Sequence, residues 1–146
     1  MASLRGAVKA LLQGDATLGG LTSLVLDSED VGRDGLQRKD LLAAPSSTQI
    51  SPGVFIKWRS GVPWEALIFE AEQVFCEIYF YQEIGYSTCE AMRRQVKVLL
   101  HRQQVDIDDG FCLEIYWRGD ITDSFDPALN NVSMERSRYE ARITRE

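Results

Sequence analysis

Few of the 146 residues could carry out catalytic or metal chemistry. The single histidine, His101, ends a cationic helical stretch, and no carboxylate is spaced to orient it as the base of a nucleophilic site. Cys76, Cys89 and Cys112 are odd in number and lack C-x-x-C spacing, which predicts reduced thiols in a cytosolic setting instead of zinc ligands or disulfides. We therefore expect no catalytic, metal or cofactor site and no enzymatic activity.

Two acidic motifs also have simpler explanations than metal binding. The stretch Asp106-Ile-Asp-Asp-Gly110 begins like a calcium loop, but its fifth position is Gly110 and its twelfth is Trp117, where a calcium loop needs Glu. We interpret it as a turn. The acidic cluster Glu65, Glu70 and Glu72 is typical of a solvated surface.

The overall charge also excludes some classes of partner. A formal net charge of −6 argues against nucleic-acid binding as the main task, because phosphate contacts need clustered Lys and Arg. No apolar run approaches the roughly 18 residues of a membrane helix, and the N-terminal residues lack the apolar core of a signal peptide. No membrane partner is expected.

Hydrophobic periodicity predicts a single α+β domain over residues 1–146, with elements in the order α-β-β-α-β-β. A mostly antiparallel four-stranded sheet should pack on two helices, at 3–13 and 88–103. Ser87 and Glu90 should form a capping box for the second helix. Strands are expected at 54–59, 73–82, 111–118 and 133–143, with a further short strand at 21–26 and loops at 27–53 and 119–131. Residues 64–73 fit either a helix or the wide end of a hairpin.

Two strands present aromatic and charged side chains on the face opposite the core. Alternation from residue 74 puts Val74, Cys76, Ile78 and Phe80 on the core face. The opposite face must be covered either by a second layer of this chain or by a neighbouring subunit, and we favour the neighbour. On the last strand, an outward row of charges is interpreted as protection of a sheet edge. The candidate subunit or partner interface is Phe75, Glu77, Tyr79, Tyr81, Tyr116, Arg136, Arg138 and Arg142.

The loop at 27–53 is unusually long for a compact domain. Such a loop is either a binding element, ordered by a partner, or a tolerated insertion without fixed structure. The candidate partner-binding residues are Asp27, Glu29, Asp30, Arg33, Arg38 and Lys39.

Order and spacing together resemble the tail terminator family of long-tailed bacteriophages, also called tail completion or minor tail proteins. The residues that carry the resemblance are Leu4-x-x-x-Val8-x-x-Leu11-Leu12, Val74-Phe-Cys-Glu-Ile-Tyr-Phe-Tyr81, Ser87-x-x-x-Ala91-x-x-x-x-Val96-x-x-Leu99-Leu100 and Arg138-Tyr-Glu-Ala-Arg-Ile143. The loops at 27–53 and 119–131 depart from the commonest form of the family.

The resemblance implies a structural virion protein, assembled in the host bacterial cytoplasm. It would form a ring, typically a hexamer in this family, that caps the tail tube protein and ends its polymerisation. The ring would join the tail to the head–neck connector or stopper protein, and DNA would pass through its lumen without sequence-specific binding. Two alternatives remain: another neck or tail component, such as a head-closure or tube-like protein, and a small cytosolic ligand-binding α+β domain.

Overall fold

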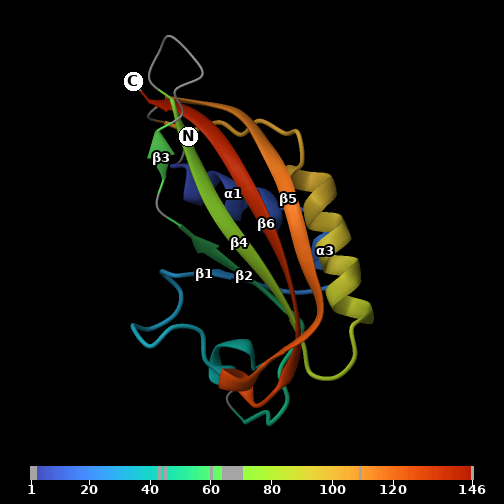
Figure 1. The fold of residues 1–146 in the computed structure, drawn as a ribbon. Coiled ribbons are helices and arrows are strands. Elements are labelled where there is room, and N and C mark those ends of the chain that lie inside the picture. The colour runs from blue at the N-terminus through green and yellow to red at the C-terminus, as the bar shows by residue number, and fades with distance from the viewer. Residues whose placement is uncertain are drawn as a thin grey trace.

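The computed structural model of the chain describes residues 3–42, 44, 46–59, 61–63, 71–108 and 110–145. Its frame is one twisted sheet with helices on one side and a long connection on the other (Figure 1). The elements follow the order α1 (Leu4–Gln13), α2 (Ala16–Gly19), β1 (Leu24–Asp27), the 3-10 turn η1 (Arg38–Leu41), β2 (Gly53–Trp58), β3 (Val62–Pro63), β4 (Glu72–Gln82), α3 (Ser87–Leu100), β5 (Gly110–Asp126), the 3-10 turn η2 (Pro127–Leu129) and β6 (Val132–Arg145).

The strand order across the sheet is β1-β2-β4-β6-β5, and β3 pairs with β4 beside this path. Only β1 and β2 run parallel among the described pairs; the others are antiparallel. The predicted α+β class and mostly antiparallel sheet are confirmed. The four predicted long strands are β2, β4, β5 and β6, and the short strand expected at 21–26 is β1. The sheet has six strands instead of the predicted four, because β1 and the two-residue strand β3 also pair with it, and the structure adds the four-residue helix α2.

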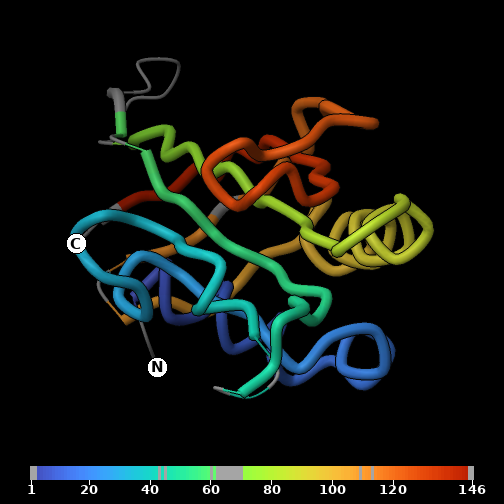
Figure 2. Tube along the Cα trace, turned by 90° about the horizontal axis from the view of Figure 1, so that it is seen from below, coloured from blue at the N-terminus to red at the C-terminus, as the bar shows by residue number. Residues whose placement is uncertain are grey.

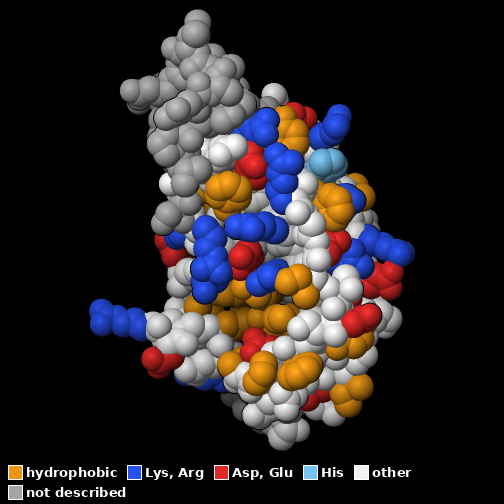
Figure 3. All heavy atoms as spheres, in the orientation of Figure 1, with side chains coloured by type: hydrophobic (Ala, Val, Ile, Leu, Met, Phe, Trp, Pro, Cys, Tyr) orange, Lys and Arg blue, Asp and Glu red, His pale blue; other side chains and the backbone are white. Residues whose placement is uncertain are grey.

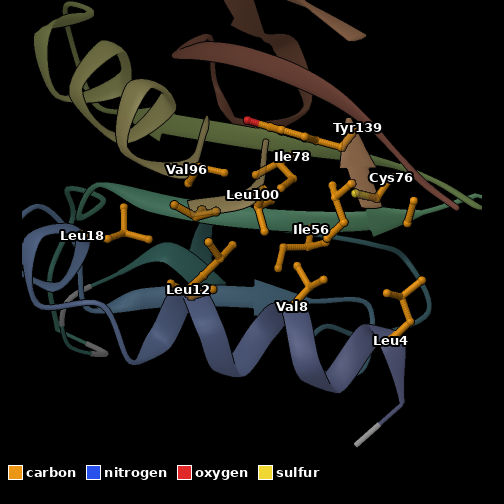
Figure 4. Packing of buried hydrophobic residues seen from close by; sticks show 14 of the residues in the cluster. Leu4, Val8, Leu12, Leu18, Ile56, Cys76, Ile78, Val96, Leu100 and Tyr139 are labelled. Carbon is orange, nitrogen blue, oxygen red and sulfur yellow. The ribbon is translucent and has the colours of Figure 1, made fainter. Parts of the chain in front are cut away.

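The main core lies between the sheet and the two longer helices, as the periodicity predicts. Leu4, Val8 and Leu12 form the buried stripe of α1, and in Figure 4 they point toward Ile56 and Ile78 of the sheet. Ser3 caps this helix by accepting a hydrogen bond from the Gly6 N–H at 3.2 Å. Burial of these side chains, each worth about 1.5–3 kcal/mol, is what holds the short helix in place.

The start of α3 differs from the prediction. The helix begins at Ser87, and neither Ser87 nor the preceding Tyr86 caps it through a side chain. Instead, the Gln82 side-chain oxygen accepts from the N–H groups of Thr88 (2.9 Å) and Cys89 (3.1 Å). The predicted Ser87–Glu90 capping box is therefore wrong: a side chain from the end of β4 satisfies the free N–H groups of this helix end.

Two predictions about the last strands are also wrong. Most of the stretch 119–131, expected to be a loop, continues β5 to Asp126, and only η2 and the turn at Asn130–Asn131 follow. Register shifts along β5 absorb the irregular residues, and one of them, between Cys112 and Glu114, leaves Phe111 65% exposed and Cys112 buried, opposite to simple alternation. β6 is not an edge strand, because it lies between β4 and β5.

The segment 28–52 connects β1 to β2 and packs against the outer side of the sheet. Leu41 and Ile50 from this segment are buried with Phe55, Tyr81 and other residues in a second core. Seen from below, α3 stands almost end-on at one side of the molecule and this connection makes a wide excursion at the other (Figure 2). Neither interpretation of the loop anticipates this second core. The ambiguous stretch 64–73 lies mostly outside the described residues, as do Glu65 and Glu70 of the acidic cluster.

Candidate interaction surface

The outer side of the sheet has a second region, beyond the 28–52 segment, which we call the open sheet face. Cross-strand register sets its pattern: Lys57, Glu77 and Arg138 are neighbours across β2, β4 and β6. Figure 3 shows Lys and Arg side chains gathered here around acidic and hydrophobic ones. The open sheet face consists of Lys57, Arg59, Gln73, Phe75, Glu77, Tyr79, Glu114, Tyr116, Arg118, Arg136, Arg138, Glu140 and Arg142.

Glu77 organises one half of this face. Its Oε2 atom lies 3.0 Å from an Arg59 nitrogen and 3.7 Å from an Arg136 nitrogen, and it accepts a 2.7 Å hydrogen bond from the Tyr79 hydroxyl. Burial of the carboxyl opposes its ionisation, but the hydrogen bonds from Tyr79 and Arg59 and the charge of Arg136 outweigh burial. The pKa of Glu77 is therefore lowered from its ordinary value.

Glu140 organises the other half in the same way. Its two oxygens accept from Arg118 (3.1 Å) and Arg142 (2.7 Å), and the Gln73 amide donates at 3.2 Å. Burial again opposes ionisation, while Arg142 and Arg118 favour it, so the pKa of Glu140 is also lowered. Both carboxylates are less than 10% exposed, so each is a buried anion held between two arginines.

Aromatic rings support the guanidinium groups. Arg142 lies 4.5 Å and Arg118 5.3 Å from the centre of the Tyr116 ring. Arg138 lies 5.5 Å from the Phe75 ring, and Arg136 lies over Tyr79. These distances are within the range of cation–π attraction. The Tyr116 hydroxyl donates to Glu114, a hydrogen bond that, with burial, raises the pKa of Tyr116.

Seven of the eight candidate interface residues come together on this face. The exception is Tyr81, which is 3% exposed and belongs to the second core, where its hydroxyl lies 3.3 Å from an Asp126 oxygen. The face also includes six residues that are missing from the candidate set: Lys57, Arg59, Gln73, Glu114, Arg118 and Glu140. Alternation along each strand indicates on which side of the sheet these residues lie. The register between neighbouring strands decides with which residues they pair.

The six candidate loop residues divide into two groups. Asp27, at the end of β1, and Asp30 pair with Lys9 of α1 (3.5 and 2.6 Å), and Arg38 pairs with Glu83 at 2.5 Å. Asp30 and Arg38 therefore fasten the 28–52 segment to the rest of the chain. The other three are exposed, and within the described residues their side chains form no hydrogen bond or ion pair: Glu29, Arg33 and Lys39.

A buried ion cluster between α3 and the sheet has no counterpart in the candidate set. Arg93 donates from Nε to Glu135 at 3.0 Å and from a terminal nitrogen to Asp120 at 2.9 Å. The second oxygen of Asp120 accepts from the Trp117 indole (2.9 Å) and the Ser137 hydroxyl (2.6 Å). The Glu135 position on the core face of β6 is the only sequence signal for this cluster, because a carboxylate there requires a cationic partner.

The residues that could do chemistry are occupied or buried. His101 Nδ1 accepts from the Trp117 backbone N–H at 3.0 Å. Burial raises the pKa of the Cys76 and Cys89 thiols to about 12. Among the described residues, no three His, Cys, Asp or Glu side chains are grouped so that they could hold a metal ion. The described helices include none with the length and apolar character needed to cross a membrane.

Comparison with known proteins gives a likeness in fold. No protein-family model matches the chain. No curated protein matches it either. Among solved structures, the chain is similar to one chain in the virion of a native gene transfer agent particle, with a TM-score of 0.66 and 17% sequence identity. The match covers 97% of this chain and 94% of that one, so the two share their fold from end to end.

Proposed function

We propose that the protein is a structural component of a phage-like virion, of the tail terminator type. The observation that supports this most is the end-to-end likeness in fold to a virion chain, which leaves almost no part of either chain unmatched. The order and spacing of elements that resemble tail terminators are consistent with the same role.

In this role the protein is a single tail-terminator-like domain that forms a ring, most simply a hexamer. One face of the ring is complementary to the last ring of tail tube protein, and the other face does not reproduce that surface, so tube growth stops. The second face meets the head–neck connector or stopper protein. The exposed loop residues Glu29, Arg33 and Lys39 are available for one of these contacts.

The proposed ring also encloses the path of DNA. Six copies of a chain with net charge −6 carry about −36 in total if all charges are retained. A strongly acidic ring repels DNA phosphates on average, which favours passage over adhesion.

We propose a structural and not a catalytic role for the polar residues. The cysteines support this, because a pKa near 12 leaves Cys76 and Cys89 as thiols at neutral pH, whereas the thiolate is the reactive form. Four of the five arginines of the open sheet face pair with Glu77 or Glu140 of the same face.

The test combines native mass with a tube-capping assay. Light scattering over a concentration series, with and without the tail tube protein of the same particle, is expected to show a ring alone or a ring formed on the tube. Tubes grown with the protein present should be shorter in electron micrographs, with density at one end. A protein that adds along the tube would instead be a tube component, and a monomer at every concentration that leaves tube length unchanged would refute the proposal.

A further inference from the structure

The open sheet face differs in charge from the rest of the chain. It carries six cations (Lys57, Arg59, Arg118, Arg136, Arg138 and Arg142) against three carboxylates (Glu77, Glu114 and Glu140), which leaves +3 on this face. Because the whole chain has a net charge of −6, everything outside the face sums to −9. The molecule is therefore polar, with one basic face on an otherwise acidic body.

The amino-acid composition of this face and the restricted freedom of its side chains are typical of a protein interface. Arginine and aromatic residues are enriched in interfaces and in their energetically dominant positions. Four of the five arginines are held by the buried carboxylates of Glu77 and Glu140. Three of these four, Arg118, Arg136 and Arg142, also lie over aromatic rings, so little side-chain freedom is left to lose on binding. A nucleic-acid site, in contrast, needs cations that are free to reach phosphates.

Two cations differ from the rest. Within the described part of the chain, Arg138 and Lys57 form no ion pair, and both are exposed. Arg138 lies over Phe75 near the middle of the cross-strand rows, next to Glu77 on β4 and Gly119 on β5. An acidic group on a partner would therefore pair most favourably with Arg138.

We propose that the open sheet face binds a second copy of this chain, and that it does so through a different, acidic face of that copy. Two open sheet faces cannot meet each other, because a self-complementary contact would oppose +3 with +3. A contact between different faces joins the basic face to the acidic body and generates a ring when the rotation closes. The inference rests on the proposed ring and names the surface and polarity of its contact.

The test reverses the charge of Arg138. Arg138→Glu changes an exposed side chain, so the melting temperature should be unchanged within a few degrees. Light scattering at low salt should show the concentration of half-assembly raised about tenfold or more, since about 1.4 kcal/mol is a factor of ten. The matched control is Arg94→Glu, the same charge change at an exposed position of α3, on the other side of the sheet, and it should leave assembly within about threefold of the wild type.

A mixing experiment reports the polarity of the contact. An Arg138→Glu copy still has its acidic body, so it should bind the open sheet face of a wild-type copy and stop further addition. A small fraction of Arg138→Glu should therefore break wild-type rings into short oligomers. If the contact instead joined two identical open sheet faces, the wild type would form closed dimers, and the variant would be left out of them without breaking them.

The outcomes separate this inference from the proposed function. Wild-type rings that cap tubes, with Arg138→Glu assembling equally well, would overturn the inference and leave the function standing. Salt-sensitive rings lost in Arg138→Glu but without effect on tubes would support the inference and refute the function. A wild-type dimer that closes on itself, a wild-type monomer under all conditions, or binding of duplex DNA that Arg138→Glu abolishes would each overturn the inference.

Discussion

Replacing Arg93 with Met should destabilise the fold more than any other removal of a charge on α3. The Arg93 side chain is 18% exposed and contacts Asp120 and Glu135, which are 15% and 3% exposed. Met fills the space of the aliphatic stem but leaves two carboxylates facing each other without a cation. Removing one member of a buried ion pair typically costs about 3–5 kcal/mol.

We expect Arg93→Met to lower the free energy of unfolding by about 3 kcal/mol, the low end of this range, because the cluster retains some access to water. For a domain of this size, 1 kcal/mol shifts the melting temperature by roughly 2–4 °C, which gives a loss of about 6–12 °C. Urea denaturation should show a lower midpoint with an unchanged slope. Adding Glu135→Gln to Arg93→Met removes the more deeply buried of the two unmatched carboxylates, so the double variant should recover about 2 kcal/mol relative to the sum of the single changes.

The control for this experiment is the next residue of the same helix. Arg94 is 72% exposed and pairs with Glu90 one turn away, a contact worth only a few tenths of a kcal/mol. Arg94→Met should therefore change stability by less than about 0.5 kcal/mol. Equal effects of Arg93→Met and Arg94→Met would refute the assignment of the Arg93 cluster as a buried, mutually dependent group of charges.

Three further outcomes are expected. Gln82→Ala should cost about 1 kcal/mol in urea denaturation, because it removes the cap of α3, whereas Ser87→Ala should be close to neutral. The pKa values of Glu77 and Glu140 are lowered in the folded state, so their ionisation stabilises the fold above the unfolded pKa, near 4.3, and this stabilisation is lost as pH falls through the folded pKa values. Between pH 7 and pH 3 the melting temperature should therefore fall less steeply in the double variant Glu77→Gln/Glu140→Gln than in the wild type. Leu12→Ala, at a position 1% exposed, should lower the free energy of unfolding by about 2–5 kcal/mol, and a loss below 1 kcal/mol would contradict the packing of α1.

The elements with long regular patterns could be predicted from the sequence. In α1 the apolar residues recur every three or four positions, and in β4 the core-facing residues from Val74 to Phe80 alternate over seven positions, so both the element and its buried face follow from local information. The extent of β5 could not be predicted in this way. Gly119 and Asp123 have positive φ angles of 127° and 52° within it, residues typical of turns, and only the pairing with β6 carries the strand through them.

The second core shows the same limit over a longer distance. Leu36, Leu41 and Ile50 are scattered through a polar segment without a helical or strand period. Their burial depends on packing against Phe55 and Tyr81 of the sheet, a contact that no local pattern in the sequence indicates. On the open sheet face, alternation indicates which side chains point outward, but register decides that Glu77 meets Arg59 and Arg136 and not another cation.

The two regions of the outer sheet surface together limit how a partner can bind. The 28–52 segment already covers Phe55 and Tyr81, so a partner cannot use those rings, and the remaining rings lie under arginines. Glu77 and Glu140 already pair with arginines of this chain. A partner therefore does not have to bury them as unpaired anions, a step that would otherwise oppose association. In the proposed contact, most of the open sheet face would supply shape and apolar area, while the unmatched charge of Arg138 and Lys57 would select an acidic partner. Specificity carried by so few positions explains why one reversed charge should weaken assembly without affecting the fold.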